Sequence, residues 1–306
     1  IYSRRHIEHG TKRRSGKKFR AALWKNDRFW FSVFILINRV PFYKKMRSIV
    51  ASIFLLIGQP TAQINRQGPA LDFASLYPDS NIFIPNRAEW QIIAYKGRID
   101  DFRKDPIGYN KIVFLGNSIT EGGKDWNKMF GLNNVVNRGI TGDITESMLA
   151  RLNEIYYYKP IKVFLLIGLN DVFDGVVPYK QDITPEKIVN NIYQIASNIK
   201  TYSQGTKIYI QTLLPINEPQ FRRVRGFYPK HNTPLEIQIN DINRKIIEKN
   251  DDNGYKVIDL YSLFVDNDGR MKEELSKDGV HLNDEGYKVW ANHVEKFIKI
   301  DETNID

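Results

Sequence analysis

The chain has 306 residues, 42% of them hydrophobic and 26% charged, a composition typical of a soluble globular protein with one large domain and an appendage. It contains no cysteine, which excludes disulfides, thiolate catalysis and cysteine-ligated metal sites. The net charge is +10, but residues 1–63 hold 14 basic and 2 acidic side chains, and the remaining 31 basic and 33 acidic side chains nearly cancel. A body this close to neutral disfavours a nucleic-acid partner, because phosphate binding requires clustered positive charge.

The N-terminal part is predicted to be a leader. Basic residues around Met46 precede the apolar run Ile49–Ile57, and small residues follow before Gln63, which is the order of a secretory signal. The apolar run is too short to span a bilayer. We therefore expect residues 46–63 to be a signal peptide of an exported (periplasmic or secreted) protein, and residues 1–45 to be a basic leader outside the native protein. The alternative is a genuine membrane-proximal tail, which would confine membrane contact to this leader.

Residues 64–87 are predicted to be an irregular lead-in, since they are rich in Pro, Asn and Asp and lack periodicity. Apolar spacing then predicts a helix from Trp90 to Phe102, after which strand-like and helix-like segments alternate. The expected strands are 112–116, 134–137, 163–167, 207–212 and 256–260, and the expected helices are 120–130, 144–157, 185–202, 234–250, 269–276 and 284–299. This alternation predicts one α/β domain over 88–306, with a parallel sheet covered by helices on both faces.

A serine follows the first predicted strand. The apolar run Ile112–Leu115 ends at Gly116, and Asn117 and Ser118 come next. Ligands of parallel sheets bind beyond the carboxyl ends of the strands, so a hydroxyl here lies where chemistry is expected. Asn and Ser are also favoured helix caps, and this stretch alone leaves the cap and the nucleophile equally open. It is not the G-x-S-x-G elbow, because a threonine occupies the place of the second glycine.

Polar residues follow the next two strands as well. The turn from Gly139 to Gly142 contains two glycines, which allow the backbone to approach a substrate and present free N–H groups. Asn170 follows the third strand, where its side-chain amide could reach a developing oxyanion. Each motif taken singly is also ordinary turn chemistry.

Asp278 and His281 lie three residues apart in a short loop before the last predicted helix. This spacing lets the carboxylate hold the ring at Nδ1 while Nε2 faces another strand end, as a nucleophilic serine requires. The pair alone is also compatible with a helix cap beside a bystander histidine.

Taken together, four blocks resemble those of the SGNH hydrolases, also called the GDSL esterase family. They are GNSIT from Gly116, the glycines after the second strand, GLND from Gly168 and DGVH from Asp278. The resemblance covers roughly residues 88–300. It implies a flavodoxin-like three-layer α/β/α sandwich with a five-stranded parallel sheet in the order 2-1-3-4-5.

The resemblance also implies roles for individual residues. Ser118 would be the nucleophile and His281 the general base, oriented by Asp278. The oxyanion hole would consist of the backbone N–H groups of Ser118 and Gly139 and the side chain of Asn170. Asn117 stands where the family usually has Asp, which is not a member of the triad. No metal and no cofactor is implied.

The segment 216–233, after the fourth strand, is predicted to be a long loop at the active-site end. Its basic side chains are interleaved with Phe221, Phe227 and Tyr228. One interpretation is a solvated basic face, and the other is a lid that receives an acidic or carbohydrate ligand. Together with two polar residues from the strand ends, the candidate substrate-binding residues are Asn117, Asp171, Arg222, Arg223, Arg225 and His231.

The overall pattern is similar to the acetylhydrolase branch of the family, which includes platelet-activating-factor acetylhydrolase-like enzymes and carbohydrate O-acetylesterases. This implies a serine esterase that hydrolyses short-acyl esters, acetyl above all, on a carbohydrate through an acyl-enzyme. A lysophospholipase or thioesterase of the same family is the alternative enzyme, and a non-catalytic exported glycan-binding protein is the alternative of another class. The expected partner is a small-molecule or glycan ester, and the sequence sets no oligomeric state.

Overall fold

The structure is a computed structural model that describes residues 72–79, 81–173, 177, 179–180, 182–249 and 254–299. All of these belong to the second of the two units into which the chain divides, Gln67–Asp306. The predicted leader (1–45) and signal peptide (46–63) lie outside the described residues. No described helix is both long and apolar enough to cross a bilayer.

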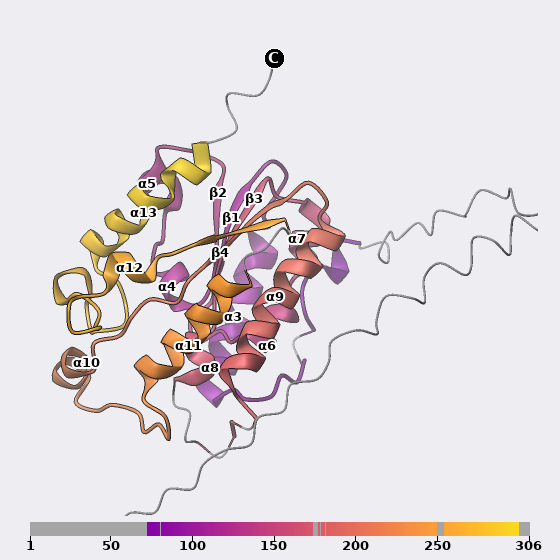
Figure 1. Cartoon of the computed structure of the whole chain (residues 1–306). Helices are drawn as coiled ribbons and strands as arrows, with labels where there is room; N and C mark the ends of the chain where they lie inside the picture. Colours follow the sequence, from indigo (N-terminus) through magenta and orange to yellow (C-terminus); the bar gives the residue numbers. More distant parts are fainter. Residues whose placement is uncertain are drawn as a thin grey trace, which may run out of the picture. The chain divides into compact units, whose positions relative to one another are not determined.

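Five strands form one sheet, and every neighbouring pair is parallel (Figure 1). They are β1 (Ile112–Gly116), β2 (Val135–Gly139), β3 (Lys162–Leu166), β4 (Lys207–Gln211) and β5 (Tyr255–Ile258). The spatial order is β2-β1-β3-β4-β5. Strands β1 and β3 are buried along their whole length, as expected at the centre of a sheet that is covered on both faces. The predicted flavodoxin-like topology is confirmed.

Helices cover both faces of the sheet (Figure 1). One face carries α5 (Trp126–Phe130), α12 (Tyr261–Phe264) and α13 (Asp284–Lys299); the other carries α6 (Thr145–Leu149), α7 (Asn153–Tyr158), α9 (Pro185–Tyr202) and α11 (Leu235–Glu248). Helix α3 (Glu89–Lys104) packs beside α6, where the Tyr95 hydroxyl donates to the Ser147 carbonyl oxygen (3.2 Å). The remaining short elements are η2 (Ala74–Leu76), α4 (Ser118–Glu121), α8 (Leu169–Val172), α10 (Glu218–Arg225) and η3 (Glu273–Leu275).

Aromatic rings fill the core under α5 and α13. Phe114, Phe164 and Tyr209 stand in register on β1, β3 and β4. Neighbouring rings of this row stack with centroids 4.8 and 4.7 Å apart. Trp126 and Trp290 close the cluster from the helices, with their rings 4.9 Å apart and nearly perpendicular. Such large apolar surfaces contribute strongly to stability and fix the two helices against the central strands.

Several predicted elements differ from the structure in extent. The predicted helix 120–130 is divided into α4 and α5 by two glycines and by Lys124 at φ +52°. The predicted helix 144–157 is divided into α6 and α7, and of the predicted helix 269–276 the structure has the 3-10 turn η3. Apolar spacing continued through these breaks, so the periodicity alone did not reveal them.

The predicted loop 216–233 contains a helix, α10. Asn217 caps it by accepting the Gln220 backbone N–H (2.9 Å), and Pro219 occupies the first turn. Gly226 ends the helix at φ +77°. These are ordinary start and stop signals, so the helix could have been expected from them.

Candidate active site

Strands β1, β2 and β3 end at the same level of the sheet. Gly116 at the end of β1 is paired with Gly139 on one side and with Leu166 on the other. The segments that follow these three strands therefore meet at the carboxyl edge, where parallel sheets bind their ligands.

Ser118 is the first residue of α4, immediately after the turn that leaves β1. The turn requires glycine at position 116, since a Cβ there would lie 2.0 Å from Thr120 Oγ1. Asn117 is buried, and its Oδ1 accepts the Ile119 N–H (3.0 Å). Asn117 is therefore a helix cap rather than the substrate-binding residue that was predicted, and its capping leaves the neighbouring serine hydroxyl at the helix start.

Ser118, His281 and Asp278 form a hydrogen-bonded chain of side chains. His281 Nε2 lies 3.1 Å from Ser118 Oγ, and His281 Nδ1 lies 3.0 Å from Asp278 Oδ2. Asp278 Oδ1 also accepts the backbone N–H of His281 (2.8 Å). A carboxylate partner at Nδ1 assigns the ring proton to that nitrogen and leaves Nε2 free to accept the serine proton.

Arg225 on α10 contacts the same carboxylate. Its Nε lies 3.0 Å from Asp278 Oδ2, and its Nη2 donates to the same oxygen. Burial acts to raise the pKa of the Asp278 carboxyl, but hydrogen bonds from the ring and backbone of His281, together with Arg225, hold that pKa well below its usual range. The carboxylate therefore stays ionised at physiological pH, as a group that stabilises a protonated imidazole must.

Gly139 does not occupy the position predicted for it. It is the last residue of β2, which runs two residues further than predicted. Its N–H donates to the side-chain oxygen of Asn137 (2.9 Å), and it lines neither of the cavities that adjoin Ser118. A Cβ at this position would meet the Glu121 backbone nitrogen at 2.1 Å, so this glycine permits close packing of α4 on β2. The N–H of Gly139 is thus used inside the fold.

Gly142, at the other end of the same turn, faces the site instead. It has φ +78° and lines one cavity together with Ser118 and Asn170. Its carbonyl oxygen accepts Gln91 Nε2 from α3 (2.7 Å), which fixes the orientation of the peptide. Within the described part of the chain its N–H makes no hydrogen bond. We name residues 139–142 the glycine turn.

Asn170 lies in the first turn of α8, beside the glycine turn. Its Nδ2 donates to the carbonyl oxygen of Asp143 (3.0 Å), which fixes the amide and leaves the second N–H of the same nitrogen for a ligand. The backbone N–H of Ser118 belongs to the first turn of α4, where helix N–H groups have no intrahelical partner. Three donors, from Ser118, Gly142 and Asn170, thus border one cavity.

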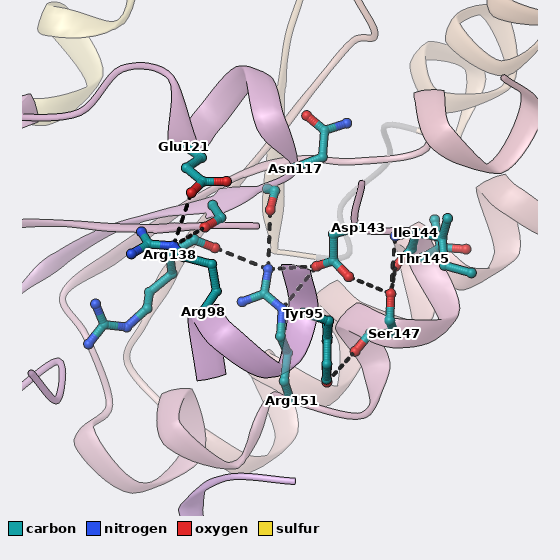
Figure 2. Close-up of polar contacts among 12 residues, drawn as sticks. Tyr95, Arg98, Asn117, Glu121, Arg138, Asp143, Ile144, Thr145, Ser147 and Arg151 are labelled. Atoms are coloured by element: carbon teal, nitrogen blue, oxygen red, sulfur yellow. Dashed lines mark hydrogen bonds and ion pairs between the residues drawn. The ribbon is translucent and has the colours of Figure 1, made fainter. Parts of the chain in front are cut away.

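A buried ion pair lies behind these donors (Figure 2). Arg151 Nη2 lies 2.8 Å from Asp143 Oδ2 and also donates to the carbonyl oxygens of Gly116 (3.1 Å) and Arg138 (3.0 Å). One guanidinium therefore connects the ends of β1 and β2 to Asp143, whose own carbonyl oxygen holds Asn170. The network thus contacts the strand ends that flank the glycine turn, and through Asp143 it contacts Asn170.

Asp171 lies away from both cavities and is buried. Its carboxylate accepts the backbone N–H of Thr145 (3.1 Å) and the Thr145 hydroxyl (2.5 Å). Burial raises the pKa of Asp171 to about 7, although the hydrogen bonds from Thr145 act to lower it. The residue joins α8 to α6, and its predicted contact with substrate is not supported by this position.

Three of the four basic residues predicted in the loop also lie outside the cavities. Arg222 forms an ion pair with Glu218 (2.7 Å) on its own helix, and Arg223 pairs with Glu273. His231 packs against an aromatic cluster, with its ring 5.7 Å from that of Tyr228. Of the predicted set, Arg225 alone reaches the triad.

Two cavities adjoin the Ser118 and His281 side chains. The larger, of about 770 Å³, is bordered by the charged groups Arg98, Glu121, Lys124, Arg225, Lys277 and Asp278, and we call it the cationic cavity. The smaller, of about 340 Å³, is bordered by the rings of Trp90, Phe173, Tyr179, Phe221 and Phe227, and we call it the aromatic cavity. The donors Gly142 and Asn170 border the aromatic cavity.

Sequence reasoning missed Gly142, Trp90 and the contact between Arg225 and the triad. The second glycine was visible in the sequence, but choosing between the two required knowing where β2 ends. Trp90 approaches the glycine turn from a helix about fifty residues earlier, and no local pattern reports such a contact. Among the described residues, no group of three or more His, Cys, Asp or Glu side chains is arranged to hold a metal ion.

Comparisons with known proteins bear on the same region. The model of the GDSL-like Lipase/Acylhydrolase family matches residues 114–289, which include every residue of the triad and all three donors. Among curated proteins, platelet-activating factor acetylhydrolase IB subunit alpha1 of Rattus norvegicus is 24% identical over 206 residues, which are 65% of this chain and 77% of the relative. The GDSL esterase/lipase CPRD49 of Arabidopsis thaliana is 23% identical over 209 residues, which are 62% of this chain and 78% of the relative.

Solved structures support the fold. A Streptococcus pneumonia protein named for platelet activating factor superposes with a TM-score of 0.57 at 24% identity, covering 68% of this chain and 94% of that protein. A GDSL-like lipase from Bacteroides thetaiotaomicron superposes with a TM-score of 0.52 at 24% identity, covering 62% of this chain and 88% of that protein. Both likenesses extend over most of the neighbouring structure and agree with the α/β/α architecture.

Proposed function

Because this chain belongs to the GDSL-like lipase/acylhydrolase family, a family of ester hydrolases, we propose that it hydrolyses short-acyl esters, acetyl above all, on a carbohydrate. The observation that carries the proposal is the contact of 3.1 Å between Ser118 Oγ and His281 Nε2, at the junction of two cavities. One cavity can receive the acyl group and the other the alcohol.

In the proposed mechanism, His281 Nε2 takes the proton of Ser118 as its Oγ attacks the ester carbonyl carbon. Asp278 holds the resulting imidazolium through Nδ1. The imidazolium then gives its proton to the alcohol oxygen, the C–O bond breaks and an acyl-serine remains. Water, deprotonated by His281, attacks this acyl group, and the acid leaves with the serine proton restored.

The carbonyl oxygen becomes negatively charged in this step and needs donors. We assign them to the backbone N–H groups of Ser118 and Gly142 and to Asn170 Nδ2, with Gly142 in place of Gly139 because the latter's N–H is occupied. Replacing Asn170 with alanine removes one donor and should raise the barrier by about 3–4 kcal/mol, mainly through kcat. Asn190, an exposed residue of α9 that lines neither cavity, provides the matched Asn→Ala control.

Two observations support a carbohydrate and a short acyl group. The cationic cavity is wide and offers polar side chains to hydroxyl groups, as a sugar ring requires. The aromatic cavity, where the donors lie, has less than half of that volume. We therefore assign the acyl group to the aromatic cavity and the alcohol to the cationic cavity.

Hydrolysis of p-nitrophenyl esters of increasing chain length tests the proposal. The wild-type protein should prefer acetate to decanoate, and Ser118→Ala should lower kcat by at least ~10³-fold, because the nucleophile is lost. Activity that survives this substitution would refute the mechanism.

A lysophospholipase or thioesterase activity is the second candidate, and the apolar lining of the aromatic cavity favours it. Trp90 and Phe227, which border it, are each more than half exposed, and such rings can also border an acyl chain. A preference for long-chain over short-chain esters in the same series would select this candidate.

A further inference from the structure

We infer that the cationic cavity selects esters whose alcohol part carries a negatively charged group, such as a carboxylate or a phosphate, and that Lys124 and Lys277 recognise this group. The inference rests on the proposed function and extends it from carbohydrate esters in general to anionic ones.

The cavity has more positive charge than its own acids neutralise. Arg98 pairs with Glu121 (3.2 Å), and Arg225 pairs with the buried carboxylate of Asp278. Figure 2 shows the first of these pairs at the end of β2. Both acids that border the cavity are therefore already engaged by arginines.

Lys124 and Lys277 are the remaining cations of the lining, and both are exposed. In the part of the chain that the structure describes, neither ammonium group forms an ion pair. Lys124 follows α4, the helix that begins with Ser118, and Lys277 precedes Asp278 directly, so each is attached to a segment that carries the triad. Both lysines border the same cavity as Ser118 and His281, so an anion held by them shares that cavity with the ester.

The excess of positive charge is confined to the cationic cavity and is not a property of the whole domain. Beyond residue 63 the chain carries 31 basic and 33 acidic residues, so a random surface cavity would be near neutral. A cavity bordered by charges of one sign raises the local concentration of the opposite charge and accelerates its association. The cationic cavity therefore favours anionic over neutral alcohols.

The arginines of the predicted lid do not carry this recognition. Arg222 and Arg223 have glutamate partners and lie outside the cavity. Arg225 holds the triad carboxylate. The preference for acidic ligands suggested by the basic segment 216–233 is thus assigned to two lysines that lie elsewhere in the sequence.

Matched substrates isolate the charge. O-acetylated glucuronic acid and its 6-methyl ester have nearly the same shape and differ by one negative charge, and O-acetylated glucose 6-phosphate and O-acetylated glucose form a second pair. We expect the wild type to prefer the anionic member by about tenfold in kcat/KM at low salt, and the preference to shrink toward one at high salt. The pair with the greater preference identifies the carboxylate or the phosphate as the favoured group.

Variants of the lysines complete the test. In the double variant Lys124→Ala/Lys277→Ala the ratio of kcat/KM between anionic and neutral members should fall to near one. The control is Lys128→Ala, which removes the same charge from an exposed position on α5 outside the cavity and should keep the wild-type ratio. Equal rates on both members in the wild type, or a ratio that survives the double substitution, overturns the inference.

Binding measurements separate this inference from the proposed function. In Ser118→Ala, titration calorimetry with glucuronic acid and with its methyl ester should show about tenfold tighter binding of the acid. If Ser118→Ala loses hydrolysis and binds both compounds equally, the proposed esterase function stands and the anion site is refuted. Hydrolysis that persists in Ser118→Ala refutes the proposed mechanism, whatever the binding shows.

Discussion

Arg225 and His281 share one carboxylate oxygen, Asp278 Oδ2. The arginine side chain is half exposed, whereas the carboxylate beneath it is buried. A positive charge at this place opposes the positive charge that the imidazole acquires when it takes the serine proton. Arg225 is therefore a positioning residue that holds Asp278 and at the same time makes the imidazolium less stable.

Replacing Arg225 with alanine should lower the rate of the reaction. Without the guanidinium the Asp278 carboxylate loses a partner and orients the His281 ring less firmly, so kcat should fall while KM changes little. The control is Arg222→Ala, which removes the same charge from a surface pair with Glu218. Equal kcat values in the two variants would contradict this role.

At the scale of single residues, the sequence predicted those whose role is local. Ser118 lies two residues after the end of a strand, and Asp278 and His281 are three residues apart. The resemblance of these motifs to the blocks of the family then brought the three residues together in the prediction. Gly139 was chosen over Gly142 because the strand was ended two residues early. The partner of Arg225 could not be predicted, because α10 and the loop of Asp278 meet through tertiary contacts alone.

At the scale of the elements, the ion pair between Asp143 and Arg151 connects the ends of β1 and β2 to the residue that follows the glycine turn (Figure 2). The Arg151 guanidinium donates four hydrogen bonds to three acceptors, which are Asp143 Oδ2 and the carbonyl oxygens of Gly116 and Arg138. A lysine cannot reproduce this planar fork of donors. We expect the pair to position the Asn170 side chain as well as to stabilise the fold, because the Asp143 carbonyl oxygen accepts a hydrogen bond from Asn170.

We expect Arg151→Lys to lower kcat by about ten- to a hundredfold with little change in KM, because the donors bind the transition state and move when Asp143 moves. The control is Glu154→Gln, which weakens a second, equally buried ion pair with Arg138 that does not contact the donors. That variant should lower the melting temperature and keep kcat. A kcat that follows the melting temperature equally in both variants would refute a positioning role.

Helix α10 is docked on the loop that carries Asp278 and His281. Gly279 of this loop has φ +83°, and a Cβ there would lie 2.3 Å from the Asn217 carbonyl oxygen. Close packing of this kind means that α10 supports the loop that carries Asp278 and His281.

Gly279→Ala should therefore impair both stability and catalysis, since the loop must shift to admit the methyl group. Gly269→Ala is a matched control, because Gly269 has φ +79° and a Cβ there meets nothing within 4 Å. The control should cost about 1 kcal/mol of unfolding free energy through backbone strain and keep kcat. Gly279→Ala should lose more unfolding free energy and at least about tenfold in kcat, by the displacement of His281. Equal kcat values would show that the docking is unimportant.

For the whole molecule, stability should depend on the protonation of Asp171. Its pKa is about 7 in the fold and near 4 in the unfolded chain. Between these values the folded state holds a proton that the unfolded state has released, so the unfolding free energy falls as pH rises from about 4 to 7, by a few kcal/mol from this group.

Denaturant unfolding at pH 5 and pH 8 measures this dependence. Asp171→Asn keeps an oxygen for Thr145 but cannot ionise, so its unfolding free energy should fall less between the two pH values than that of the wild type. Asp268→Asn, at an exposed surface position, should behave as the wild type. An unchanged pH dependence in Asp171→Asn would show that the buried carboxyl is not responsible.

The fold as a whole was predictable because alternation of strand and helix signals restricts a chain of this length to few topologies. All five strands were predicted within one or two residues at their ends. The breaks within the predicted helices 120–130 and 144–157 were not predicted, since apolar residues at helical spacing look the same in one long helix and in two short ones. Asp143 and Arg151 neutralise each other's charge in the interior, although they are eight residues apart in the sequence. No local pattern predicts such a pair, so only the packed structure reveals it.

The tryptophans of this domain provide separate optical reporters. Trp126 and Trp290 are fully buried with their rings nearly perpendicular, so their short-wavelength emission and near-UV circular dichroism should disappear together when the domain unfolds. Trp90 is about half exposed and borders the aromatic cavity, so its emission should respond to an acyl group entering there while the buried pair stays constant. In Trp90→Phe the response to ligand should vanish and the unfolding signal remain, which allows occupancy and folding to be followed in one spectrum.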